Sequence, residues 1–154
     1  MTGLKPKLEL TKIWQDDDMV ELRIHVCDGT SAFSNKVYVG HQNLRNVVSE
    51  LNTFKDHIYG GIYDLRFGEF GPEYASGALH ARLQFHDRGK LLISAHMESD
   101  YSDFGPKNVA SEANLYLISE PSLLDDFIQA LRSLSEGNCV DADLDAIDSP
   151  WTWD

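Results

Sequence analysis

Residues 79–97 alternate apolar and polar side chains in two runs separated by a short polar break. The apolar positions are Leu79, Ala81, Leu83 and Phe85, then Leu91, Ile93, Ala95 and Met97. A period of two is typical of a strand with one buried face. If both runs share that face, Phe85 lies opposite Leu91, and Asp87-Arg88-Gly89 forms a three-residue loop with a left-handed glycine. The pattern predicts a β-hairpin, because a slip of one residue would expose the whole apolar set.

The same alternation predicts three strands in the first part of the chain, over residues 7–14, 20–26 and 33–39. Acidic and glycine-containing turns separate them, at residues 15–18 and 28–31. These connections are too short for a crossover helix, so the strands are expected to be antiparallel. Two further short strands are predicted at 62–67 and 113–117.

A helical period replaces the alternation in two places. The first apolar stripe is Leu44, Val47, Val48, Leu51 and Phe54, and the second is Leu124, Phe127, Ile128, Leu131 and Leu134. They predict amphipathic helices over about 42–57 and 121–136. Asn43 is the expected cap of the first. The second should begin with a capping box from Ser122 to Asp125 and end at Gly137.

The predicted order is strands, a helix, strands and a second helix, without regular alternation of single strands and helices. This order predicts an α+β fold. We expect a curved or split antiparallel sheet of six to seven strands, covered by the two helices. Residues 1–137 are of ordinary size for a single domain. Residues 138–154 are acidic and are expected to form a loosely ordered C-terminal tail.

Composition indicates a cytoplasmic protein. No apolar run approaches the roughly 20 residues that a membrane-spanning helix needs, and the first residues lack the apolar core of a signal peptide. The two cysteines, Cys27 and Cys139, form no Cys-x-x-Cys pair, and we expect no disulfide.

The chain carries 25 acidic against 13 basic residues, a formal net charge of −12. Such a charge disfavours nucleic acid and anionic membranes as partners and speeds association with a basic protein. An acidic surface also serves solubility alone, so the charge by itself does not decide between these roles.

The sequence offers little for catalysis, and we expect neither enzymatic activity nor a cofactor. It has no Gly-x-Ser-x-Gly elbow, no phosphate-binding loop and no His-Glu-x-x-His motif. In the tail, Asp141, Asp143 and Asp145 have the spacing of a calcium loop. Ala146 and Thr152 stand where such a loop needs glycine and glutamate, so a solvated acidic segment is the better interpretation.

One set of residues has the chemistry of a partial metal site. In the predicted hairpin His80 lies opposite His96 on the outer face, with Glu98 one step along. Two imidazoles and a carboxylate are zinc ligands, but two strands supply an incomplete set. Exposed surface histidines are the alternative, and no metal is expected.

Two loops, the glycine-rich 59–76 and the polar 98–112, combine aromatic and acidic side chains. The candidate partner-binding residues are Tyr63, Glu69, Phe70, Glu73, Tyr74, Asp100, Tyr101, Asp103 and Phe104, and the loops also hold Tyr59 and Phe67. Aromatic residues anchor protein interfaces and charge steers association, which suits a basic protein partner. Equally, these rings could plug the core beneath the loops.

Over about residues 19–135 the pattern resembles a known family. Its parts are the strands at 20–26 and 33–39, the stripe from Leu44 to Phe54, the hairpin from Leu83 to Ile93, the strand at 113–119 and the stripe from Leu124 to Leu134. This arrangement resembles the WapI-type immunity proteins of bacterial polymorphic toxin systems and related small bacterial domains. The aromatic loop is longer than in that pattern and the acidic tail is extra. The resemblance implies binding to a cognate toxin and supplies no catalytic residues.

The sequence therefore supports a hypothesis of a non-enzymatic immunity protein that occludes the active site of a basic toxin, for example a nuclease. The alternative is a protein that binds a small ligand or metal at the outer histidine face or in a curved sheet. A third is an enzyme with carboxylates or histidines that converge in a pocket. An exposed sheet edge would also allow a homodimer.

Overall fold

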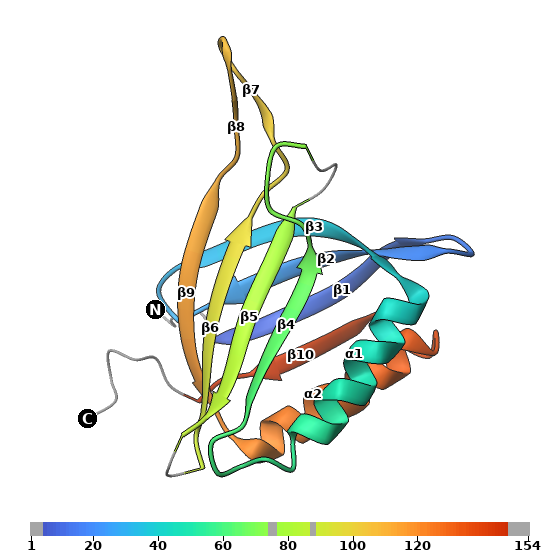
Figure 1. Cartoon of the computed structure of the whole chain (residues 1–154), viewed down its shortest axis with the longest axis vertical. Coiled ribbons are helices and arrows are strands. Elements are labelled where there is room, and N and C mark those ends of the chain that lie inside the picture. The colour runs from blue at the N-terminus through green and yellow to red at the C-terminus, as the bar shows by residue number, and fades with distance from the viewer. Residues whose placement is uncertain (1–4, 74–76, 87–88, 148–154) are drawn as a thin grey trace.

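The computed structural model describes residues 5–73, 77–86 and 89–147, and within them the chain forms ten strands and two helices. The α+β class and the two helices are confirmed (Figure 1). The predicted sheet is split, into two sheets of four strands and a two-stranded ribbon, and the predicted count of six to seven strands is too low. All their pairings are antiparallel.

The first sheet, sheet A, has the order β10-β1-β2-β3. Its strands are β1 (Lys7–Gln15), β2 (Met19–Cys27), β3 (Ala32–Gly40) and β10 (Asp141–Asp145). The prediction of a loosely ordered tail is wrong for β10, whose Leu144 is fully buried opposite Leu8 of β1. Ala142 is buried beside it, so this short strand adds to the core despite its acidic sequence. Residues 148–154 lie outside the described residues.

The second sheet, sheet B, has the order β4-β5-β6-β9. Its strands are β4 (Ile62–Gly68), β5 (Ala78–Phe85), β6 (Leu91–Glu98) and β9 (Glu112–Ser119). The predicted hairpin register is confirmed, with Phe85 opposite Leu91. The amide of His86 donates to the Lys90 carbonyl oxygen over 2.8 Å, and Gly89 is left-handed with φ 77°. Asp87 and Arg88 lie outside the described residues.

The helices are α1 (His41–Phe54) and α2 (Pro121–Ser135). Both apolar stripes are buried as predicted, but both predicted caps are wrong. Gly40 stands at the N-cap of α1, so Asn43 lies inside the helix. Pro121 occupies the first helical position of α2, so the N-cap is Glu120 and not Ser122. The Glu120 side chain makes no capping hydrogen bond. Gly137 is left-handed after α2, as expected for a helix stop.

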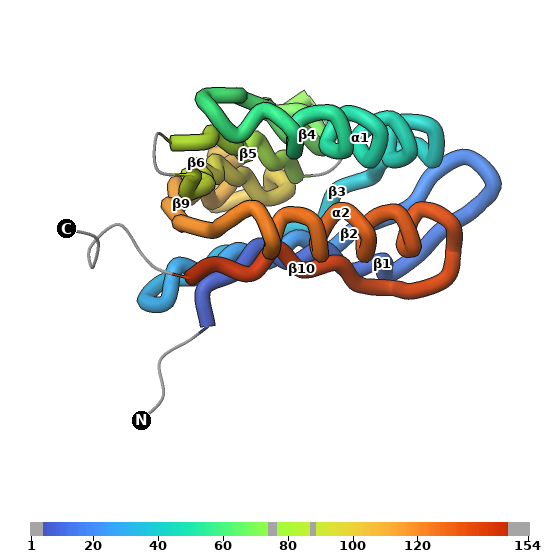
Figure 2. Tube along the Cα trace, turned by 90° about the horizontal axis from the view of Figure 1, so that it is seen from below, coloured from blue at the N-terminus to red at the C-terminus, as the bar shows by residue number. Residues whose placement is uncertain are grey.

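The core lies between the inner faces of the two sheets and the helices. Seen from below, α2 runs between the layer of α1 and β4 and the layer of β10 and β1 (Figure 2). α2 packs against both β10 and α1. The outer face of sheet B has no helix over it in either view (Figures 1 and 2). Neither helix in the described ranges is long and apolar enough to cross a membrane.

A buried amide joins the two sheets. The side-chain nitrogen of Asn35, on β3, donates to the carbonyl oxygens of Ala78 and Glu98 over 2.9 and 2.8 Å. The amide of Gly77 donates to the Lys36 carbonyl oxygen over 2.9 Å. β3 is thereby fixed across the ends of β5 and β6, from which the loops of the candidate site emerge.

Candidate functional site

A narrow ribbon projects from the end of sheet B. β7 (Ser102–Phe104) and β8 (Lys107–Val109) continue β6 and β9 beyond the sheet and pair with each other (Figure 1). Every residue from 102 to 109 is exposed. Phe104, next to the turn at Gly105, is 72% exposed. The sequence pattern predicts only a polar loop here, because strands of three residues are too short to show an alternation.

The loop after β4 lies at the base of this ribbon. A carboxylate oxygen of the nearly buried Glu98 accepts a hydrogen bond from the Gly71 amide over 2.9 Å, and the Tyr101 hydroxyl donates to the other oxygen over 3.5 Å. Phe70 stacks on His96, with ring centroids 4.6 Å apart and planes 4° apart. Residues 69–73 and 98–112 therefore form one surface, which we call the ribbon end.

Carboxylates dominate the charge of the ribbon end. Its acidic residues are Glu69, Glu73, Glu98, Asp100, Asp103 and Glu112, and Lys107 is its one lysine or arginine. Desolvation raises the pKa of Tyr101, and the nearby Glu98, Glu112 and Glu73 carboxylates raise it further. The phenol therefore stays neutral in a strongly negative field. A positively charged partner surface would be attracted to this end.

The structure brings most of the predicted partner-binding residues together. Glu69, Phe70, Glu73, Asp100, Tyr101, Asp103 and Phe104 all lie at the ribbon end. Tyr63 does not, because its hydroxyl donates to Glu50 of α1 over 2.8 Å and its ring packs on Phe54. Tyr74 lies outside the described residues. The core-plug interpretation holds for Phe67, which is 3% exposed.

The candidate metal ligands share the outer face of sheet B but contact different carboxylates. His80 and His96 are opposite each other, as predicted. The Nε2 atom of His80 lies 2.9 Å from Asp64, and that of His96 lies 3.2 Å from Glu112. The Glu98 carboxylate accepts a hydrogen bond from the Gly71 amide, in the loop after β4. Within residues 5–73, 77–86 and 89–147, no group of three potential ligands is placed to hold a metal ion.

A small ionic network stabilises the same face. Arg82 donates to both oxygens of the Asp64 carboxylate, over 2.9 and 3.2 Å. Hydrogen bonds from Arg82 and His80 hold the pKa of Asp64 well below its usual range. Because these groups lie at matching positions on β4 and β5, the network fastens the edge strand to the sheet.

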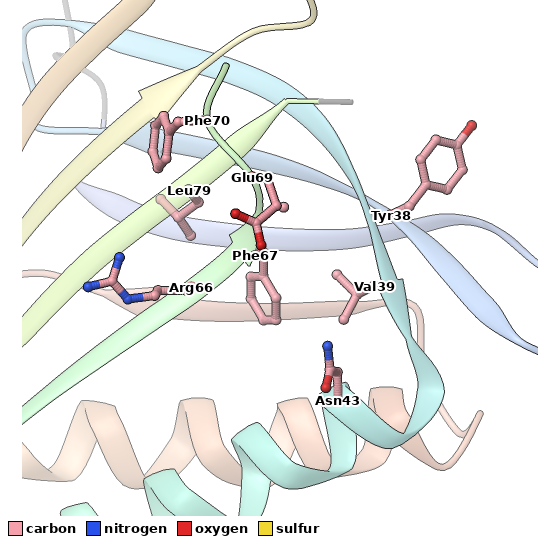
Figure 3. Close-up of a pocket in the computed structure, with 9 residues that line it drawn as sticks. Tyr38, Val39, Asn43, Arg66, Phe67, Glu69, Phe70 and Leu79 are labelled. Carbon is pink, nitrogen blue, oxygen red and sulfur yellow. The ribbon is translucent and has the colours of Figure 1, made fainter. Parts of the chain in front are cut away.

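A pocket of about 400 Å³ lies between β3, the start of α1 and the end of β4 (Figure 3). Its lining residues are Tyr38, Val39, Asn43, Arg66, Phe67, Gly68, Glu69, Phe70 and Leu79. Glu69 and Phe70 belong to the ribbon end, so the pocket adjoins that surface. The sequence did not mark Tyr38 or Arg66, and it marked Asn43 only as a helix cap, because a pocket between separate elements has no local pattern.

Comparisons with known proteins give no match. No protein-family model matches the chain, and neither the curated proteins nor the solved structures contain a significantly similar one.

Proposed function

We propose that this chain is an immunity protein that binds a cognate basic toxin in the cytoplasm through its ribbon end and occludes the toxin's active site. The ribbon itself is the observation that carries the proposal. Its residues are exposed along both strands, so they contribute almost nothing to the core. Ordering a chain segment costs roughly 1–2 kcal/mol per residue, and a partner that binds the ribbon would offset this cost.

The shape and charge of the ribbon suit an active-site groove. A two-stranded ribbon is narrow enough to enter a cleft, and Phe104 near its turn offers an exposed apolar anchor. Asp103 places a carboxylate on β7, and Asp100 places another in the connection that precedes it. Nuclease toxins present basic grooves to phosphates, which carboxylates can mimic. The resemblance of the sequence pattern to WapI-type immunity proteins supports the same class of partner.

A pull-down from the source organism tests the binding surface. The bait is the full chain, either unchanged or as the double variant Asp103→Asn/Phe104→Ala. The matched control is Asp56→Asn/Tyr59→Ala, which also removes one carboxylate and one exposed ring, at the opposite end of the molecule. Loss of a central aromatic anchor weakens binding by about tenfold or more, so the ribbon variant should lose a partner that the control retains.

Ionic strength is the second variable. Capture is compared at about 0.1 M and about 1 M salt, where the Debye lengths are about 10 and 3 Å. We expect one basic protein that is retained at low salt and weakened at high salt. Equal capture by both variants, or loss in the Asp56/Tyr59 control alone, would refute the ribbon end as the binding surface.

Toxin neutralisation is tested separately with the captured protein. Its expression in a bacterial host should stop growth, and co-expression of the unchanged chain should restore growth while the ribbon variant does not. A harmless partner, or growth arrest that the chain does not relieve, would refute the immunity role even if binding is confirmed.

The second candidate function is binding of a small ligand. The pocket between β3, α1 and β4 favours it, because about 400 Å³ falls within the range of about 300–1,000 Å³ typical of small-molecule sites. A ligand that co-purifies with the chain, together with no protein captured at either salt concentration, would favour this function over the first.

A further inference from the structure

The pocket lies where two sheets leave their edges unpaired. β3 is the last strand of sheet A and β4 the first of sheet B, so among the strands that the structure describes neither has a hydrogen-bonded neighbour on that side. Val39, Phe67 and Leu79 are buried and supply apolar lining. The pocket therefore has an apolar base and an opening at the protein surface.

Two polar side chains point into this space. Figure 3 shows the Glu69 carboxylate above Phe67 and the Asn43 side chain directed upward from α1, with its amide nitrogen uppermost. Within the described part of the chain, neither side chain makes a hydrogen bond or ion pair. The Glu69 carboxylate, which lacks an internal partner, is available as an acceptor for a ligand.

We propose that this pocket binds a cation carried on an aliphatic stem, either an ammonium or a guanidinium group. The stem would lie on Val39, Phe67 and Leu79, as long basic side chains do when they cover apolar surface. The cation would donate hydrogen bonds to the Glu69 carboxylate, the acidic side chain of the pocket lining. Hydrogen bonds between charged partners are the stronger kind, and the net charge of −12 adds a favourable field.

Arg66 provides an internal test of the ligand's charge. Its guanidinium also borders the pocket, but in Figure 3 it points away from Glu69, and no ion pair joins the two within the described residues. Arg66 would repel a cation and attract an anion. Neutralising Arg66 should therefore strengthen binding of a cation, whereas neutralising Glu69 should weaken it.

The cation has two possible sources. It is either a free small molecule or a lysine or arginine side chain of a protein. The site does not depend on the immunity proposal, since a free cation would occupy it equally well. If the protein source holds, the pocket adds a specific anchor next to the ribbon end.

The experiment is a titration followed by amide chemical shifts in two-dimensional NMR. The probes are agmatine, as a free guanidinium, and the blocked peptide Gly-Gly-Arg-Gly-Gly. The same peptide with citrulline in place of arginine is the neutral control of the same shape. We expect saturable shifts at Gly68, Phe70 and Asn43, and none at Gly29, which lies beyond the end of β3 opposite to Val39. The citrulline peptide should bind at least about fivefold more weakly than the arginine peptide.

The variants separate charge recognition from general attraction. Glu69→Gln should weaken binding of the cationic probe by about fivefold. Glu73→Gln, which removes an exposed carboxylate in the same loop but outside the pocket lining, should change it less than twofold. Arg66→Gln should strengthen it. Equal losses in the two glutamate variants, weaker binding in Arg66→Gln, or no saturable shifts with either probe would overturn the proposal.

The two probes distinguish the sources. Agmatine that binds while the blocked peptide does not assigns the site to a free molecule, because the peptide backbone is then excluded. Peptide binding at least as tight as that of agmatine assigns it to a protein side chain. Failure of both probes would leave toxin capture through Phe104 unaffected, so the two proposals can fail independently.

Discussion

Removal of the buried leucine of β10 should destabilise the whole fold. Leu144 is fully buried and pairs with Leu8 of β1, on the strand against which α2 packs. Leu144→Ala removes three buried carbon atoms, which at about 0.8 kcal/mol each corresponds to about 2.4 kcal/mol of transfer free energy. The cavity left behind raises the expected loss to about 3 kcal/mol. The free energy of unfolding of a typical domain is only about 5–15 kcal/mol, so this loss is a large fraction of it.

Urea denaturation followed by circular dichroism measures this loss. With a slope of about 2 kcal/mol/M, the midpoint should fall by about 1.5 M. Val140→Ala is the matched control, because Val140 lies just before β10 and is 56% exposed, and it should shift the free energy of unfolding by less than about 0.5 kcal/mol. Equal midpoints for the Leu144 variant and the unchanged chain would show that β10 is not part of the cooperative unit.

Three further predictions concern the sheets and their ends. Asp64→Asn removes the acceptor of Arg82 and should lower the free energy of unfolding by about 1 kcal/mol near pH 7, discounted for partial exposure. Because the folded pKa of Asp64 is depressed, its contribution to stability is present above the unfolded pKa of about 3.9 and fades as the pH falls below that value. Urea midpoints of the unchanged chain and the variant, measured at several pH values, test this. A difference in stability that grows on acidification would contradict the prediction. Gly77→Ala should cost about 2 kcal/mol in thermal or urea unfolding, since its Cβ would lie 2.6 Å from the Glu98 carbonyl oxygen, and an unchanged midpoint would be inconsistent with that contact. Burial raises the pKa of Tyr63, so Tyr63→Phe should leave the tyrosinate absorbance of the folded chain unchanged at about pH 10–11, and a drop there would mean that the phenol ionises normally.

The sequence by itself determined the parts of the fold that depend on local periodicity. The β5–β6 hairpin and its register follow from a period of two together with the short loop that ends at Gly89, because a slip of one residue would turn the apolar positions to the outer face. The buried stripes of α1 and α2 follow from the helical period. Composition also located the acidic and aromatic loops, although it could not separate the buried Phe67 from the exposed Phe104. Whether each ring is buried depends on which other segments of the chain pack over it.

Tertiary structure decided everything that joins distant segments. β10 has only Ala142 and Leu144 as buried apolar positions between acidic residues, so its pairing with β1 at the other end of the chain has no local signal. The two sheets meet where β3 crosses the ends of β5 and β6, and Asn35 of β3 fixes this crossing through carbonyl groups of those strands. The pocket forms in the gap that this division leaves, between side chains of β3, α1 and β4. Alternation shows which face of a strand is buried, but neighbouring strands and the shape of the space between them are set by packing of the whole chain.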